Sequence, residues 1–142
     1  MNREELQAVA EAYVDAFRRH DAAALAGSHS IDGLVESPMF ATLQGRQAIE
    51  ESYRQLFAAF PDFDLRLDSV LVDPPRVAMT TTNFGTHVNE FLGLPGTGKH
   101  FEFLLARLVT VENGLIARER RIYDFTGFLV QIGILRAKPA KP

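Results

Sequence analysis

The feature that most constrains the fold is a change in hydrophobic period near residue 63. Before it, apolar residues recur every three or four positions, as on one face of an amphipathic helix. After it, apolar and polar residues alternate, as in strands that bury one side of a sheet. Helices followed by a run of strands are typical of an α+β domain, with the helices packed on one face of an antiparallel sheet. The 142 residues suffice for one such domain, 1–142, and are too few for two.

Local signals mark the ends of the predicted helices. Asn2 and Glu5 have the spacing of a capping box, and Asp21 is a favoured N-cap residue. Pro61 ends the third helix because proline cannot continue a helical hydrogen-bond ladder. The predicted helices span about residues 3–20, 22–26, 46–60 and 125–135.

The predicted strands are separated by turns of recognisable chemistry. Pro74-Pro75 and Asn113-Gly114 mark two tight turns. Pro38 stops the first strand or places it at a sheet edge. The predicted strands cover about residues 33–38, 63–73, 76–88, 100–111 and 115–123, with a long Gly/Pro-rich connection at 90–99 and a disordered tail at 136–142.

Composition excludes several classes of function. The chain contains no cysteine, which rules out disulfides, zinc–thiolate sites, iron–sulfur clusters and thiol catalysis. Fifteen basic and eighteen acidic residues give a formal charge of −3, so we expect no nucleic-acid and no membrane partner. The charged N-terminus is unlike a signal peptide and no apolar run is long enough to span a membrane, so the cytoplasm is the expected location.

Two kinds of site can be argued against from the motifs. Residues 93–99 satisfy G-x-x-x-x-G-K, but His100 stands where a phosphate loop needs Ser or Thr, and a predicted strand follows instead of a helix. The four histidines show no metal-ligand spacing, so we expect neither a metal nor a cofactor. Any chemistry must then come from acids and bases in a pocket.

Asp124 is the first candidate for such a role, and two interpretations of it remain open. It follows the last predicted strand and precedes an aromatic turn that contains Phe125 and Phe128. A carboxylate desolvated among these rings would have a raised pKa and could exchange a proton with a carbon acid. Alternatively, Asp124 is the N-cap of the terminal helix.

Other polar residues of the predicted sheet and helices are weaker candidates. His87 shares a strand face with Thr81 and Asn83, and it is either a satisfied core group or a catalyst. Tyr13 lies on the apolar stripe of the first helix, where it packs or donates to a substrate oxygen. Four arginines lie in predicted strands: Arg107, Arg118, Arg120 and Arg121. The favoured interpretation is that they form a solvated rim of the sheet, and the alternative is that one of them binds an anionic group of a substrate.

Two clusters of residues resemble the SnoaL-like polyketide cyclases of the NTF2-like superfamily. Together with the order of elements, the resemblance covers residues 4–135. The matching residues are Gly85-Thr86-His87, 90–95 and Thr97-Gly98-Lys99, followed by Asp124, Gly127, Leu129 and 131–135. Departures occur at Asn89 and Gly96, and Ser37 stands where a ketosteroid isomerase would place its base, so an isomerase of that type is disfavoured.

The resemblance implies a cone-shaped α+β barrel, a curved antiparallel sheet closed by helices around a deep apolar cavity. It also implies cofactor-free acid–base chemistry, such as aldol-type ring closure or a related proton transfer, on an apolar carbonyl-containing small molecule. Asp124 would be the acid/base, with His87 or Tyr13 polarising the carbonyl. The expected substrate contacts are Tyr13, Phe17, Asn83, Phe57, Tyr53 and Phe128.

Two further expectations follow. The open outer face of such a sheet predicts a homodimer. The alternative to an enzyme is a non-catalytic small-molecule-binding or dimerisation module, with the cavity filled by side chains and Asp124 acting only as a cap.

Overall fold

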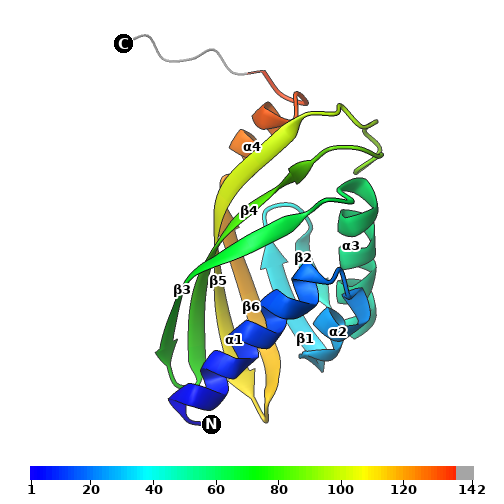
Figure 1. Ribbon diagram of the computed structural model, residues 1–142. Coiled ribbons are helices and arrows are strands. Elements are labelled where there is room, and N and C mark those ends of the chain that lie inside the picture. The colour runs from blue at the N-terminus through cyan, green and yellow to red at the C-terminus, as the bar shows by residue number, and fades with distance from the viewer. Residues whose placement is uncertain (137–142) are drawn as a thin grey trace.

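One six-stranded sheet and four helices make up the fold in the computed structural model, which describes residues 1–136 (Figure 1). The predicted α+β class is confirmed, and residues 137–142 of the expected tail lie outside the described part. In chain order, the elements are α1 (Arg3–Arg18), α2 (Ala22–Gly27), β1 (His29–Ser37), β2 (Ala41–Gln44), α3 (Arg46–Ala59), β3 (Asp64–Asp73), β4 (Arg76–Thr86), β5 (His100–Glu112), β6 (Leu115–Tyr123) and α4 (Phe125–Gln131).

The helices begin where their caps predict. Asn2 and Glu5 form the reciprocal bonds of a capping box at α1, and the Asp21 side chain accepts from the Ala24 N–H at α2. The helix α3 ends before Pro61, as expected. None of the helices within residues 1–136 is long and apolar enough to cross a membrane.

The sheet has the strand order β2-β1-β6-β5-β4-β3 and differs from the prediction at one end. All neighbouring strands are antiparallel except β1 and β6, which run parallel. The first strand is therefore internal rather than at the edge, although it stops at Pro38 as expected. The edge strand is β2, a short and mostly exposed segment that the sequence pattern did not reveal.

The long connection between β4 and β5 folds back on itself. The His87 N–H donates to the Lys99 carbonyl at 3.0 Å, and the Gly98 N–H donates to the His87 carbonyl at 2.8 Å. A side chain at Gly96 would collide with the Val88 carbonyl, which explains glycine at that position. Strand β5 follows directly, so the context that a phosphate loop requires is absent from this segment.

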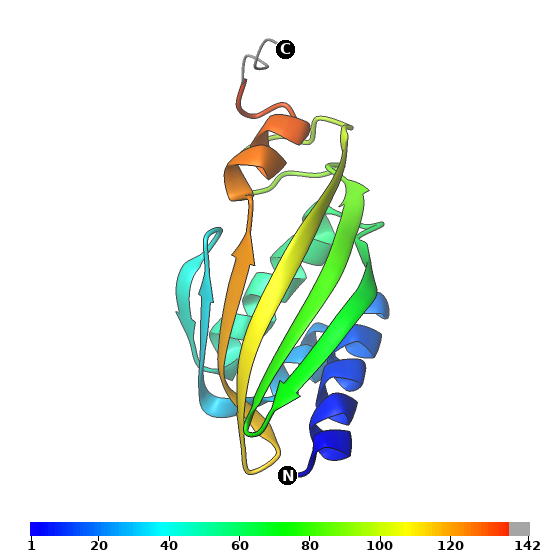
Figure 2. The same ribbon diagram turned by 90° about the vertical axis from the view of Figure 1, so that its left-hand side faces the viewer.

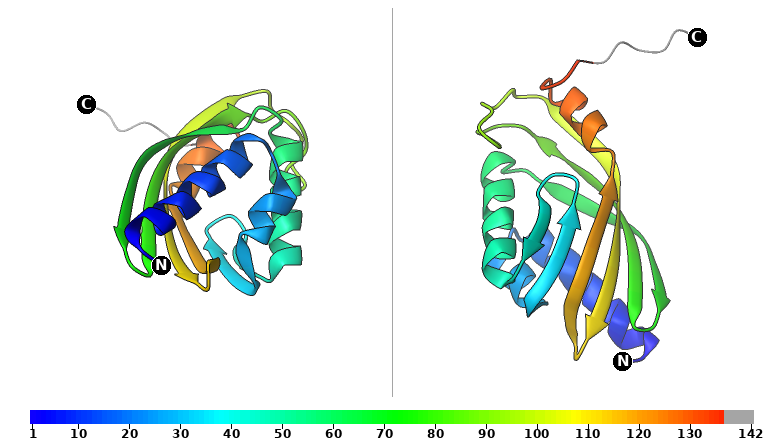
Figure 3. Two further views of the ribbon diagram at one scale, coloured as in Figure 1. Left: turned by 60° about the horizontal axis from the view of Figure 1, so that its bottom comes forward. Right: turned by 180° about the vertical axis from the view of Figure 1, so that it is seen from behind.

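The helices cover the inner, concave face of the sheet. The sheet curves around α1, while α2 and α3 pack together beside β1 (Figure 3). The short helix α4 lies at the end of the sheet where β5 begins, and the Gln131 side chain holds the Glu102 backbone there (Figure 2). Phe60 is fully buried at this end, and its ring contacts those of Phe63, Phe91, Phe101 and Phe128. Much of the phenylalanine surplus therefore fills the core.

Candidate functional site

A cluster of charged and phenolic side chains lies buried between the helices and the sheet. We call it the Glu119 cluster; its members are Tyr13 of α1, His29 of β1, Tyr53 of α3, Arg107 of β5, and Glu119 and Arg121 of β6. Each member is at most 6% exposed. Buried charges are rare unless they are paired, so this cluster is the most unusual electrostatic feature of the core.

The Glu119 carboxylate is the centre of the cluster. Its Oε1 atom lies 2.9 Å from His29 Nε2, and its Oε2 atom lies 2.6 Å from Arg121 Nε. Tyr13 donates its hydroxyl to the same Oε2 atom at 3.1 Å. Arg107 Nε is 3.6 Å from Oε2, which is an ion-pair distance but too long for a hydrogen bond.

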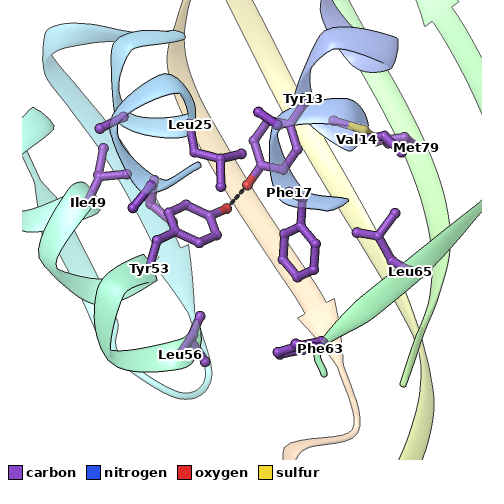
Figure 4. Packing of buried hydrophobic residues seen from close by; sticks show 14 of the residues in the cluster. Tyr13, Val14, Phe17, Leu25, Ile49, Tyr53, Leu56, Phe63, Leu65 and Met79 are labelled. Atoms are coloured by element: carbon purple, nitrogen blue, oxygen red, sulfur yellow. Dashed lines mark hydrogen bonds between the residues drawn. The ribbon is translucent and has the colours of Figure 1, made fainter. Parts of the chain in front are cut away.

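Two tyrosine hydroxyls extend the cluster towards α3. Tyr13 and Tyr53 point at each other across the core and are joined through their hydroxyl groups (Figure 4). Arg121 Nη2 donates to the Tyr53 oxygen at 2.8 Å. Because Tyr13 donates to Glu119, Tyr53 must donate to Tyr13. The hydrogen bonds thus run in one direction, from Arg121 through Tyr53 and Tyr13 to Glu119.

The charges of the cluster shift one another's pKa values. Burial alone would raise the pKa of Glu119, but Arg121, the hydrogen bond from His29 and the charge of Arg107 outweigh it and hold the pKa below its ordinary value. Burial would lower the pKa of Arg121, yet the Glu119 carboxylate outweighs burial and raises it. Burial, together with Glu119, raises the pKa of Tyr13 despite the nearby arginines. Glu119 is therefore ionised and Tyr13 neutral at physiological pH.

A small cavity adjoins the cluster. Its volume is about 30 Å³, as the space that the centres of water molecules can occupy. This volume is enough for about one or two water molecules. Met39, Phe103 and Tyr123 are its partly exposed lining residues and therefore mark the mouth. The full lining is Phe17, Ser37, Met39, Tyr53, Leu56, Phe63, Asn83, Phe103, Leu105, Arg107, Arg121 and Tyr123.

The expected substrate contacts divide into two groups. Phe17, Tyr53 and Asn83 line the cavity, and Tyr13 lies behind it, bonded to Tyr53. Phe57 is not part of the lining; it stacks on His20 at a ring-centre distance of 4.2 Å. Phe128 is also not part of the lining, since it is buried in the aromatic core around Phe60.

The two expected catalytic residues lie outside the cavity lining and do not meet there. Asp124 is exposed, and its Oδ1 atom accepts from the Gly127 N–H at 2.8 Å, which makes it the N-cap of α4. The structure thus shows the cap of the second interpretation, and an acid–base role for Asp124 stays a prediction. His87 is fully buried against Phe60, and burial lowers the pKa of its imidazole.

Sequence reasoning missed the centre of the cluster. Arg107 and Arg121 point inward, whereas Arg118 and Arg120 are exposed and pair with Glu36. Strand β6 carries charged residues on both faces, so alternation alone could not tell which face is buried. On β5 a usable signal existed, because Arg107 lies in phase with the inward Leu105 and Val109.

Within residues 1–136, no group of three or more His, Asp or Glu side chains converges as the ligands of a metal ion would. The polar groups that face the cavity are instead hydrogen-bond donors or neutral groups, from Tyr53, Asn83, Arg107, Arg121 and Tyr123. Such a set is suited to binding and polarising a carbonyl or carboxylate oxygen.

Replacement of the cap tests the role of Asp124. We expect Asp124→Ala to lower the free energy of unfolding by about 1 kcal/mol, because the Gly127 N–H loses its acceptor. Asp124→Asn should retain nearly full stability, since asparagine caps equally well. Urea denaturation measures both values. Equal losses in the two variants would show that the carboxylate charge, rather than the cap, is what the fold uses.

Replacement of Glu119 tests the buried cluster. Its folded-state pKa is lower than its unfolded value, so its contribution to stability is present above about pH 4.3 and is lost as the pH falls towards the folded-state pKa. We expect Glu119→Gln to cost about 3–5 kcal/mol at pH 7 and to reduce the loss of stability between pH 6 and pH 3. Urea midpoints across this range, with Glu36→Gln as the exposed ion-pair control, measure the effect. If the stability of Glu119→Gln depended on pH in the same way as that of the wild type, the predicted contribution of Glu119 would be contradicted.

Comparison with known proteins identifies the family. A family model described as SnoaL-like polyketide cyclase matches residues 7–132. No curated protein sequence matches the chain.

Solved structures share the fold over nearly the whole chain. AclR from Streptomyces galilaeus, a candidate hydroxylase, is 24% identical, with a TM-score of 0.84 over 97% of this chain and 91% of its own. IdmH from Streptomyces antibioticus, a candidate polyketide cyclase, is 24% identical, with a TM-score of 0.76 over 89% of this chain and 97% of its own. An NTF2-like protein of unknown function from Burkholderia pseudomallei is 16% identical, with a TM-score of 0.79 over 94% of this chain and 99% of its own. The chain thus has the NTF2-like fold and belongs to the SnoaL-like polyketide cyclase family.

Proposed function

We propose that the protein is a cofactor-free enzyme that moves a proton on a carbonyl-containing small molecule, as in aldol-type ring closure. The observation that carries the proposal is the one-directional hydrogen-bond chain from the cavity wall to a buried carboxylate. Such a chain connects a ligand in the cavity to a proton acceptor that solvent does not reach. Membership of the polyketide cyclase family supports a reaction of this class.

The cavity wall supplies the electrophilic half of the reaction. Tyr53 and Arg121 lie side by side on it, joined by the 2.8 Å bond from Arg121 Nη2 to the phenol oxygen. A substrate carbonyl oxygen placed next to Arg121 would be polarised by a fixed positive charge in a dry environment. Charge stabilisation of this kind is among the largest contributions to catalysis.

The hydroxyl chain supplies the basic half. A proton leaves the carbon next to the carbonyl and binds to the Tyr53 oxygen, while the Tyr53 proton moves to Tyr13 and the Tyr13 proton moves to Glu119 Oε2. The electron pair of the broken C–H bond moves onto the carbonyl oxygen as an enolate. The enolate carbon then attacks a second carbonyl group, and the resulting alkoxide takes the proton back through the same chain. The reaction needs no co-reactant, because the proton removed from carbon returns to the alkoxide.

The low pKa of Glu119 is compatible with this role. A free carboxylate with a depressed pKa would be a weak base. Here the negative charge moves from Glu119 to an enolate beside the same Arg121, so the arginine remains paired throughout the transfer. The proton transfer therefore leaves no buried cation without a counter-charge, which keeps its cost low.

The small cavity volume favours one alternative. A cavity of about 30 Å³ does not hold a polycyclic substrate. A non-catalytic binding or dimerisation module would have a filled cavity of this kind. Under that alternative, the Glu119 cluster is only structural. Catalysis requires the mouth residues Met39, Phe103 and Tyr123 to move apart when a ligand enters.

Hydrogen exchange on a simple ketone distinguishes these functions. We expect the wild-type protein to accelerate exchange of the methyl protons of acetophenone in D2O, followed by proton NMR. Tyr53→Phe and Glu119→Gln should each reduce the protein-dependent rate by about 100-fold or more, because each interrupts the proton chain. Arg118→Gln, on the outer face, is the matched control. Loss of exchange in Asp124→Asn, but not in Glu119→Gln, would assign the base to Asp124 instead.

We also propose that two copies associate through the outer faces of their sheets. Leu104 and Ile122 are 64% and 52% exposed there, on neighbouring strands, and Leu108 lies beside them. A groove of about 490 Å³ crosses this face next to Leu71 and Leu108. Exposed apolar side chains grouped in this way are typical of an interaction surface.

Sedimentation velocity at micromolar concentration tests the dimer. We expect a species of twice the chain mass, which Leu104→Asp converts to monomer because the charge would be buried in the apolar contact. Leu92→Asp, on the β4–β5 connection, places the same charge on an exposed leucine elsewhere and should leave the dimer intact. A wild-type protein that sediments only as a monomer would rule the association out.

A further inference from the structure

The Glu119 cluster contains more positive than negative charge. Arg107 and Arg121 are 2% and 6% exposed, and both line the cavity. Among residues 1–136, Glu119 is the one buried carboxylate within ion-pair distance of either guanidinium. Two permanent cations against one anion leave at least one positive charge without a partner in a dry environment. Such an imbalance is costly and is unusual in a core that serves packing alone.

The histidine of the cluster does not reduce the imbalance. His29 Nδ1 lies 2.8 Å from the Leu25 carbonyl oxygen, and its Nε2 lies 2.9 Å from the Glu119 carboxylate. Both partners accept hydrogen bonds, so His29 brings no negative charge to the cluster. Glu119 remains the one buried anion beside Arg107 and Arg121.

Arg107 also has unused hydrogen-bond donors. Of its five N–H groups, one bonds within the described chain, from Nη1 to Thr81 Oγ1 at 3.2 Å. Its Nε atom is fully buried and has no hydrogen-bond partner among residues 1–136, although it lies 3.6 Å from Glu119 Oε2. Thr81 in turn donates to Asn83 Oδ1 at 2.6 Å, which leaves the Asn83 amide hydrogens free of any described partner. Arg107 and Asn83 both line the cavity, and each has donor groups with no described acceptor.

Neighbouring groups do not supply the missing negative charge. Tyr13 stays protonated because burial and Glu119 raise its pKa, and desolvation likewise raises the pKa of the partly buried Tyr123. The rings of Tyr13 and Tyr53 lie 5.0 and 5.1 Å from the guanidinium carbons of Arg107 and Arg121, respectively. Aromatic faces attract a cation but carry no net charge.

We propose that the cavity binds the carboxylate of an apolar keto acid, held by Arg107 and Asn83, with its carbonyl group next to Tyr53 and Arg121. This assignment rests on the proposed function for the place and orientation of the carbonyl group only. Apolar and aromatic residues, Phe63 and Leu56 among them, make up most of the remaining lining, which suits a hydrocarbon body rather than a hydrated inorganic anion. A guanidinium and a carboxylate form the strongest type of hydrogen-bonded ion pair.

A ligand titration of the wild-type protein tests the charge preference. The probes are benzoate, its neutral isostere benzamide, and nitrate, and the readout is the arginine Nε–H signals in proton–nitrogen NMR spectra. We expect benzoate to shift the Arg107 and Arg121 signals saturably and to bind about tenfold tighter than benzamide or nitrate. The exposed Arg118 signal is the internal control. Equal affinities for benzoate and benzamide would overturn the anion site, and nitrate binding as tight as benzoate would reduce it to an adventitious ion only.

A single substitution tests the charge imbalance without any ligand. Asn83→Asp changes an amide to a carboxylate of nearly the same shape, one hydroxyl away from Arg107. Burying a carboxylate normally destabilises a protein, but here we expect a thermal midpoint raised by about 3 °C at pH 7 and loss of benzoate binding. Asn2→Asp adds the same charge at an exposed N-cap and is the control. A lowered midpoint, or failure of the Asn83→Asp variant to fold, would overturn the proposal.

The binding test and the catalytic test fail independently. If benzoate binds but the protein does not accelerate ketone exchange, the anion site stands and the proposed enzymatic function fails. If exchange is accelerated but benzoate binds no better than benzamide, the proton chain stands and the carboxylate assignment fails.

Discussion

The interaction on which the rest of the structure depends is the buried ion pair between Glu119 and Arg121. The Glu119 carboxylate accepts a hydrogen bond from the Arg121 guanidinium at 2.6 Å. The same carboxylate connects β6 to α1 through Tyr13 and to β1 through His29. Buried charges remain ionised only when their partners are held in place. The bonds from Tyr13 to Glu119 and from Arg121 to Tyr53 hold α1 and α3 at a fixed distance from β6, and the cavity lies beside Tyr53.

Local patterns in the sequence were sufficient for most of the fold. The capping box at Asn2, the cap at Asp21 and the Asn113-Gly114 turn all act within a few residues, so each was visible without knowledge of the rest of the chain. The strand β2 had no such signal, because its four residues are mostly exposed and need not alternate. The parallel pairing of β1 with β6 joins segments about 85 residues apart in sequence, and no local pattern encodes it.

The site was harder to predict than the fold for a related reason. Asp124 combined a conspicuous position with an ordinary capping function, whereas Glu119 stood between two arginines on a strand with charges on both faces. Period two correctly grouped His87 with Thr81 and Asn83 on a buried face, yet only Asn83 lines the cavity. Alternation assigns a residue to a face of the sheet, but the curvature of the sheet and the helices decides which part of that face remains open.

Aromatic packing and buried charge perform opposite functions in this core. The rings around Phe60 exclude water and fill the end near α4, which stabilises the fold through apolar packing. The same exclusion of water strengthens every interaction of Arg107 and Arg121, favourable or not. A protein that needed only stability would be better served by apolar residues at these positions. Retention of two cations beside a cavity is instead what a site requires when the counter-charge arrives with its ligand.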